Sequence, residues 1–305
     1  MPRGNDYHGF RLCMNLEVSV GTSVRRSDVP VATATPKGEY KSNYKLDDKG
    51  NAILCGEPCI SPKPEGVLVI PDKIDGHTVT KIVNRAFKDC NKMTRIVLPP
   101  HLESILHTWG GIHDLGAIFE GCFELGSIEI SKTNPQYTSE NGVLYTRAWG
   151  HPGTLHVNGK KRLIAYPKNR SEITLSRDTT EVGWSAFCSC TFKTAKVPDT
   201  VESINYWAFR DCPNLDTIEF PKSVRWIGPY AFKHNTNMKK VTFHGDAPVA
   251  GGRTRRRENL FSDSPKDIVV EVEKGSKGWK TKDSTELPER WPTTGSDSRP
   301  IRYIK

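Results

Sequence analysis

Residues 204–232 read INYWAFRDCPNLDTIEFPKSVRWIGPYAF and contain one complete repeat followed by the start of the next. The dipeptide Ala208-Phe209 returns as Ala231-Phe232, 23 residues further along the chain. Earlier copies are Ala86-Phe87, Ala186-Phe187 and the variant Ala117-Ile118-Phe119. A period of 20 to 50 residues is the sequence signature of a repeat architecture, in which short units stack on one another.

Other positions keep the same register as this dipeptide. A Cys or an Asn follows each Phe by three positions, and an apolar-x-apolar pair comes after it. The first set is Cys90, Cys122, Cys190, Cys212 and Asn235. The second set is Ile96/Leu98, Ile128/Ile130, Ala195/Val197, Ile218/Phe220 and Val241/Phe243. Five copies at matching offsets indicate a true internal repeat rather than a chance pattern.

Each part of the repeat predicts a local structure. The alternation in Leu215-Asp216-Thr217-Ile218-Glu219-Phe220 is typical of a short strand with one buried face. Pro221 then ends the strand, because proline cannot donate a ladder hydrogen bond. Ile227, Ala231 and Phe232 have helical spacing and predict a single helical turn. One such unit cannot bury its apolar face alone, so stacked copies are expected to share a continuous core.

The pattern resembles the BspA-like leucine-rich repeat family, whose repeat reads roughly I-G-x-x-A-F-x-x-C-x-x-L-x-x-I-x-I-P-x-S-V, over about residues 66–247. The resemblance implies an α/β repeat solenoid, a horseshoe of short parallel strands with helical turns. In leucine-rich repeats the Cys/Asn position faces inward and bonds neighbouring loop backbone. The five register residues are therefore expected to form a structural ladder.

Phe187 follows Phe119 by 68 positions, which leaves room for an island within the array. Residues 141–145 and 163–167 alternate as strands and predict a β-hairpin with residues 151–160 at its tip. The motif N-P-x-Y-x-S-x-N-G-V-L-Y followed by L-I-x-Y-P is similar to a familiar insertion in BspA-like proteins. The hairpin is thus expected to interrupt the solenoid.

The repeats leave a segment of non-repeating sequence at each end of the chain. We expect a leader or linker over residues 1–38, a cap over 39–65, the repeats over 66–247 and a degenerate repeat or cap over 248–305. Cys55 and Cys59 could form a disulfide, a choice that sequence leaves open. Trp279 and Trp291 suit a shield over the last core layer, with carbohydrate stacking as the alternative.

The first residues carry no apolar segment typical of a signal peptide. This fits either an intracellular protein or the tail of a longer reading frame. Tyr7–Cys13 is similar to the closing segment of formylglycine-generating (sulfatase-modifying) domains, which implies a fusion whose catalytic part lies upstream. The longest apolar run, residues 66–70, is far shorter than the roughly 20 residues that span a bilayer, so no membrane insertion is expected.

No phosphate-binding Gly loop, nucleophile elbow or zinc-protease motif occurs in the sequence, which favours a non-enzymatic protein without cofactors. An insertion of eight residues between Ile105 and Ala117 brings several metal-ligand residue types together. These are His107, His113 and Asp114, with His101 nearby. Their spacing matches no closed zinc signature, so we predict no metal site.

The predicted function is protein recognition by the outward residues of the concave sheet, which mix charges and hydroxyls. These are Arg95, Ser127, Glu129, Thr194, Lys196, Thr217, Glu219, Lys240 and Thr242, with the apolar Val97 among them. The family resemblance implies adhesion and a secreted or cell-surface location. A structural spacer for a fused domain is one alternative. Polyanion or nucleic-acid binding through Arg253–Arg257, in a chain of net charge +9, is the less favoured one. Neither the ligand nor the oligomeric state follows from the sequence.

Overall fold

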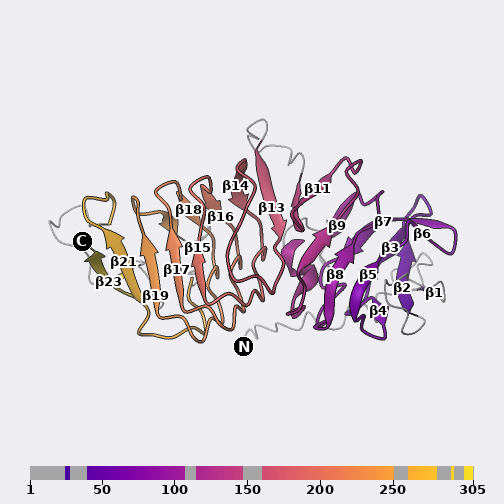
Figure 1. Cartoon of the computed structure of the whole chain (residues 1–305), viewed down its shortest axis with the longest axis horizontal. Coiled ribbons are helices and arrows are strands. Elements are labelled where there is room, and N and C mark those ends of the chain that lie inside the picture. The colour runs from indigo at the N-terminus through magenta and orange to yellow at the C-terminus, as the bar shows by residue number, and fades with distance from the viewer. Residues whose placement is uncertain are drawn as a thin grey trace, which may run out of the picture.

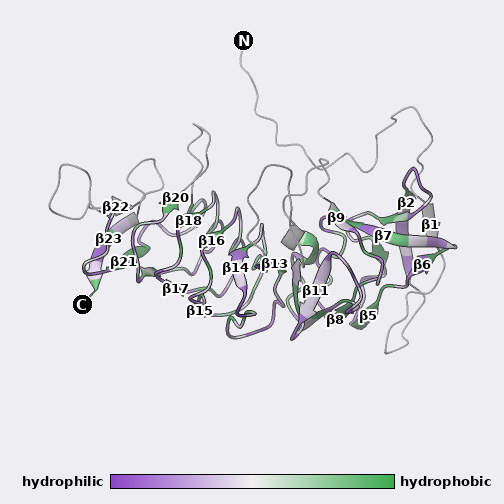
Figure 2. Ribbon diagram, turned by 90° about the horizontal axis from the view of Figure 1, so that it is seen from above, coloured by the Kyte–Doolittle hydropathy of each residue, from purple (hydrophilic) through white to green (hydrophobic). Residues whose placement is uncertain are grey.

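The computed structural model describes residues 25–27, 40–106, 115–146, 160–250, 260–279, 290–291 and 299–304. The chain winds into an elongated stack of turns, and each complete turn contributes strands to two opposed layers (Figures 1 and 2). The apolar side chains of both layers meet between them. The architecture follows from the repeat, because every turn buries its apolar positions against its neighbours.

The front layer consists of two parallel sheets. The first contains β5 (Gly66–Val69), β8 (Met93–Val97) and β10 (Ser127–Glu129). The second contains β15 (Thr194–Lys196), β17 (Thr217–Phe220), β19 (Lys240–Phe243), β21 (Val269–Glu273) and β23 (Arg299–Ile304), with β22 (Arg290–Trp291) antiparallel at its end. The register pairs Ala195 with Ile218 and Ile218 with Val241, so the inward side chains of successive turns stack directly.

The back layer is built from shorter strands. Its parallel members are β3 (Ala52–Leu54), β7 (His77–Val83) and β9 (Ser104–Leu106), then β13 (Lys161–Ala165), β14 (Thr179–Val182), β16 (Ser203–Ile204), β18 (Trp226–Ile227) and β20 (Val249–Ala250). Antiparallel strands close the N-terminal end, namely β1 (Arg25–Ser27), β2 (Lys41–Leu46), β4 (Ile60–Ser61) and β6 (Lys73–Ile74).

The predicted helical turns are wrong. Among the described residues the one helical element is η1 (Leu115–Phe119), a 3₁₀ helix. In the other repeats the residue before the Ala and the second residue after the Phe have positive φ, as at Trp207 (55°) and Asp211 (56°). Two left-handed residues four positions apart break any α-helix. The backbone instead bonds to the next turn, as when the Phe209 N–H donates to the Ala231 carbonyl at 2.8 Å.

A column of phenylalanine rings runs through the core. The centroids of Phe187 and Phe209 are 4.8 Å apart, those of Phe209 and Phe232 6.1 Å, and those of Phe232 and Phe261 5.1 Å. Tyr166 extends the column, with its ring 5.0 Å from that of Phe187. The column therefore includes Tyr166 and Phe261, which lie where the sequence pattern is weakest.

The predicted hairpin is present and lies between two halves of the stack. β12 (Val143–Thr146) pairs antiparallel with β13, and also with β11 (Tyr137–Glu140). Val143 and Tyr145 belong to the C-terminal core cluster, whereas Leu144 between them belongs to the N-terminal one. Because alternate side chains of a strand point to opposite faces, this strand has an apolar core on both sides. The hairpin thus joins the two halves rather than interrupting the fold.

Candidate recognition surface

The register residues line one side of each turn and bond the preceding turn. Cys122 Sγ lies 3.0 Å from the Phe87 carbonyl, and Cys212 Sγ lies 3.2 Å from that of Phe187. Asn235 Nδ2 donates to the Phe209 carbonyl at 2.9 Å, one turn further along. Ser264 Oγ donates to the Phe232 carbonyl at 2.7 Å, although the sequence pattern did not point to this residue. The inward polar side chain thus forms a hydrogen bond with a backbone carbonyl that is not part of a β-ladder.

Two other register cysteines have more distant neighbours. Cys90 Sγ lies 3.9 Å from the Lys88 carbonyl, and Cys190 Sγ lies 3.9 Å from the Pro167 carbonyl. Burial raises the pKa of each thiol to about 12, so both remain protonated at neutral pH. Both thiols are also fully enclosed by the core, as the ladder position predicts.

Seven cysteines are described and all are buried, and Cys55 and Cys59 are not joined by a disulfide. Within the described ranges no group of three His, Cys, Asp or Glu side chains is arranged to hold a metal. His101 lies 3.6 Å from Asp72, while His107, His113 and Asp114 fall outside the described residues.

The outer face of the front layer carries the residues predicted for recognition. On the N-terminal sheet Arg95 forms an ion pair with Glu129 at 2.6 Å, and Ser127 Oγ donates to the same carboxylate at 3.1 Å. The register sets Arg95 beside Ser127, and Val97 beside Glu129. The structure therefore brings these predicted residues together in one small network.

On the C-terminal sheet a buried carboxylate organises the predicted residues. Glu271 accepts a hydrogen bond from Thr242 Oγ1 at 3.2 Å and pairs with Lys240 at 3.2 Å and with Arg302. Burial would raise the pKa of Glu271, but the bonds from Arg302 and Lys240 hold it below its ordinary value. Thr242 is only 4% exposed, which leaves it little surface for a ligand. Sequence reasoning missed Glu271, although it alternates with Val270 and Val272 in an evident strand.

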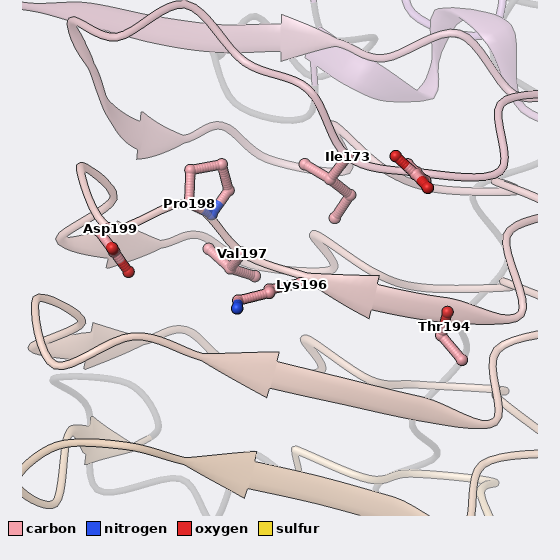
Figure 3. A pocket seen from close by; sticks show the side chains of 7 residues that line it. Ile173, Thr194, Lys196, Val197, Pro198 and Asp199 are labelled. Atoms are coloured by element: carbon pink, nitrogen blue, oxygen red, sulfur yellow. The ribbon is translucent and has the colours of Figure 1, made fainter.

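The middle of the front layer also carries exposed side chains. Thr194 and Lys196 are exposed, whereas Thr217 and Glu219 are half-buried. Glu219 lies 3.5 Å from His244, while Lys196 has no ion pair with any residue that the structure describes. A hollow of about 600 Å³ lies beside Thr194 and Lys196 (Figure 3). Its other lining residues are Glu172, Ile173, Val197, Pro198 and Asp199.

A group of half-buried aromatic residues was not predicted. Trp184 stacks on Tyr206 with 4.5 Å between ring centroids, and Trp207 stacks on Tyr230 at 6.0 Å. Trp226 joins the group through Tyr206, at 5.9 Å. The signal is in the sequence, because most of these side chains occupy the two positions before Ala in successive repeats. Much of each ring faces its neighbour, so the group serves the packing between turns.

The C-terminal tryptophan has the expected shielding position. Trp279 is 1% exposed, its Nε1 donates to the Gly245 carbonyl at 3.0 Å, and its ring lies 5.2 Å from that of Phe243. A buried ring cannot stack on a sugar, so capping is the better interpretation of Trp279. The side chain of Trp291, the segment Tyr7–Cys13 and the cluster Arg253–Arg257 lie outside what the structure describes. No described helix has the length and apolarity needed to cross a bilayer.

Solved structures of several bacterial leucine-rich repeat proteins are similar to this chain. The pneumococcal vaccine antigen PcpA has a TM-score of 0.44 at 17% identity, over 74% of this chain and 64% of that one. A protein from Eubacterium ventriosum has a TM-score of 0.40 at 17% identity, over 82% and 79%. The T. pallidum protein TpLRR has 0.36 at 21%, over 74% and 89%.

The match to PcpA thus spans less than two thirds of that protein's length. No curated protein sequence matches this chain. The family model for the BspA type leucine-rich repeat region matches six copies in residues 73–141 and 164–253, which is about half of the chain. The chain therefore belongs to the BspA-type leucine-rich repeat family.

Proposed function

We propose that this chain is a non-enzymatic recognition module of the adhesion type, which binds a protein ligand with the outer face of its front layer. The observation that carries the proposal is the exposure of Thr194 and Lys196 on a parallel sheet that no other described element covers (Figure 1). Repeat solenoids use extended surfaces of this kind for binding.

The chemistry of the face suits a protein partner. Charged and hydroxyl side chains alternate along its strands, and the strand register sets Lys196 beside Glu219 and Glu219 beside Thr242. A rigid sheet holds such side chains in place before binding, which lowers the entropic cost of association. Mixed charges favour selectivity and a fast encounter with a partner of complementary potential.

Charge reversal tests the proposal. The double variant Lys196→Glu, Glu219→Lys should weaken capture of an extracellular protein partner at least about tenfold, or roughly 1.4 kcal/mol, without lowering the melting temperature. Arg225→Glu is the matched control, since Arg225 is exposed beside a back strand. Equal capture by wild type and double variant would refute recognition through this face.

The two alternative functions, a spacer and a polyanion-binding module, predict different outcomes. A folded chain that captures no partner supports a spacer or scaffold that carries a fused domain. Salt-sensitive retention on heparin, lost when Arg253, Arg255, Arg256 and Arg257 become Gln, supports polyanion binding. We further propose a secreted or cell-surface location, which fits the family membership.

A further inference from the structure

β15 is the edge strand of the C-terminal front sheet, with β17 as its partner. The Val197 N–H donates to the Glu219 carbonyl at 2.9 Å, and the Lys193 carbonyl accepts from the Thr217 N–H at 3.4 Å. In a strand alternate residues direct their backbone groups to opposite sides. The N–H and carbonyl groups of Thr194 and Lys196 therefore point away from β17. No backbone group within the described ranges bonds them.

Residues 171–176, one turn before β15, come where the next strand of the sheet would be expected, but they form no strand. Ile173 and Leu175 lie 22 residues before Ala195 and Val197 and pack against the C-terminal core. The hydroxyl of Tyr166 binds this segment on its other side. It donates to the Glu172 carbonyl at 2.7 Å and accepts from the Thr174 N–H at 3.0 Å. These bonds attach the segment to the residue that follows β13, and no described strand pairs with the outer edge of β15.

The hollow of about 600 Å³ lies along this open edge (Figure 3). Ile173, Val197 and Pro198 supply its apolar lining. The hollow is open to solvent and is lined by polar as well as apolar side chains. An exposed strand edge is also a template for an extended peptide, which gains affinity from main-chain hydrogen bonds and specificity from pockets for alternate side chains.

We propose that an extended segment of a partner protein adds to β15 as a further strand, with a carboxylate side chain beside Lys196. We infer an acidic residue because Lys196 is positively charged and forms no ion pair with a described residue. On the other side of β15, the residue paired with Lys196 is Glu219, which is also acidic. Opposite charges on neighbouring strands favour strand pairing. An apolar residue of the segment faces Ile173 and Val197. This inference rests on the proposed function only in taking a protein as the ligand.

Amide hydrogen exchange of the whole protein is the first test. The probe is an acetylated synthetic peptide of residues 216–221, Asp-Thr-Ile-Glu-Phe-Pro, which sets Ile beside Ala195 and Glu beside Lys196. The Thr194 and Lys196 amides should exchange freely in the protein alone and become protected as peptide is added. The same peptide with Pro in place of Ile should protect both amides much less at equal concentration, because it lacks the N–H that would donate to the Thr194 carbonyl and therefore binds more weakly.

Three results would overturn the proposal. Protection of both amides without peptide shows that residues 171–176 close on β15. Protection that rises with protein concentration shows pairing of two copies. Free exchange at saturating peptide shows that no strand is added.

A pair of variants separates backbone pairing from charge. Lys196→Pro removes the open-edge N–H and leaves the groups that face β17, so it should weaken peptide binding at least about tenfold. Lys196→Gln keeps the N–H and should weaken binding no more than about threefold, the worth of an exposed ion pair. Equal losses in the two variants would refute strand addition. If Lys196→Pro does not fold, the exchange experiment on wild type decides alone. The peptide is not the natural partner, so its failure leaves the charge-reversal test of the proposed function standing.

Discussion

At the scale of single residues, one polar side chain in each turn secures the backbone of its neighbours. Asn235 shows this most fully, because it bonds both the Phe209 carbonyl and the Cys212 N–H at 2.9 Å, while its own N–H donates to Ser264 Oγ. Each of these groups is buried and would otherwise lack a partner in the core. Leaving a buried donor or acceptor unsatisfied costs about 1–3 kcal/mol.

Substitution of Asn235 tests this contribution. Asn235→Ala removes both side-chain bonds and should lower the free energy of unfolding by about 2–4 kcal/mol. Asn235→Cys should cost about half as much, because a thiol can still donate to the Phe209 carbonyl, as Cys212 does to Phe187. Urea denaturation measures both variants. A loss below about 0.5 kcal/mol for Asn235→Ala would contradict the ladder.

Asp47 gives the chain a pH-dependent contribution at its N-terminal end. Burial would raise its pKa, but bonds from Lys81 Nζ and from the Asn51 and Lys49 N–H groups lower it to about 2. A carboxylate whose pKa is depressed by folding stabilises the protein above its unfolded pKa, and the contribution disappears as the pH falls through the folded pKa.

We therefore expect Asp47→Asn to lower the melting temperature at pH 7. The difference from wild type should shrink as the pH falls from about 4 to about 2, where the wild-type carboxyl becomes protonated in both states. Thermal unfolding followed by circular dichroism at several pH values measures this. A difference independent of pH would show that the charge of Asp47 is not the cause.

At the scale of elements, left-handed residues replace the helix that the spacing suggested. The second residue after the Phe is Asp89, Gly121, Ser189, Asp211, His234 and Asp263 in successive turns, and all have positive φ. Asp and His are enriched in this region among residues with a side chain, and Gly adopts it without strain. The residue types at this position therefore argued against a helix, whereas the spacing of the apolar residues alone suggested one.

Asp89 provides a clean test of this conformation, because it is exposed and has a φ of 57°. Asp89→Val should lower the free energy of unfolding by about 1–2 kcal/mol, since a β-branched residue is strained there. Asp89→Gly should stay within about 0.5 kcal/mol of wild type. Chemical denaturation of both variants gives the comparison. Equal losses would show that side-chain contacts of Asp89, and not its backbone conformation, matter.

At the scale of the whole molecule, the two halves share the hairpin and one ionic cluster. Glu120 of the N-terminal half pairs with Arg210 of the C-terminal half, and also with Arg85 at 3.3 Å and Lys88 at 3.5 Å. Burial would raise the pKa of Glu120, but these three cations hold it below its ordinary value. The Gly121 N–H also donates to Ser189 Oγ at 3.2 Å across the same junction. The halves are thus expected to unfold together.

A double-mutant cycle measures this coupling. Glu120→Gln leaves three cations without their shared partner and should cost about 2–4 kcal/mol. The double variant with Arg210→Met should cost less than the sum of the single changes, with a coupling of about 1–2 kcal/mol. Amide exchange should then show loss of protection on both sides of the hairpin. Additive costs, or lost protection in one half alone, would mean that this cluster does not join the halves.

The repeat could be read from the residues alone, because a period of 22 or 23 with fixed apolar offsets has few physical explanations besides stacked turns. The hairpin, the front strands and the inward Cys and Asn residues followed from the same local patterns. The predicted helical turn was wrong, because the same spacing of apolar residues also fits a tight turn with left-handed residues between them. The surface also depended on distant partners. Thr242 is buried where Glu271 lies across from it in the next strand, and β15 has an open edge where residues 171–176 form no strand. Such contacts join residues that only the stacking of the turns brings together, so tertiary structure decided them.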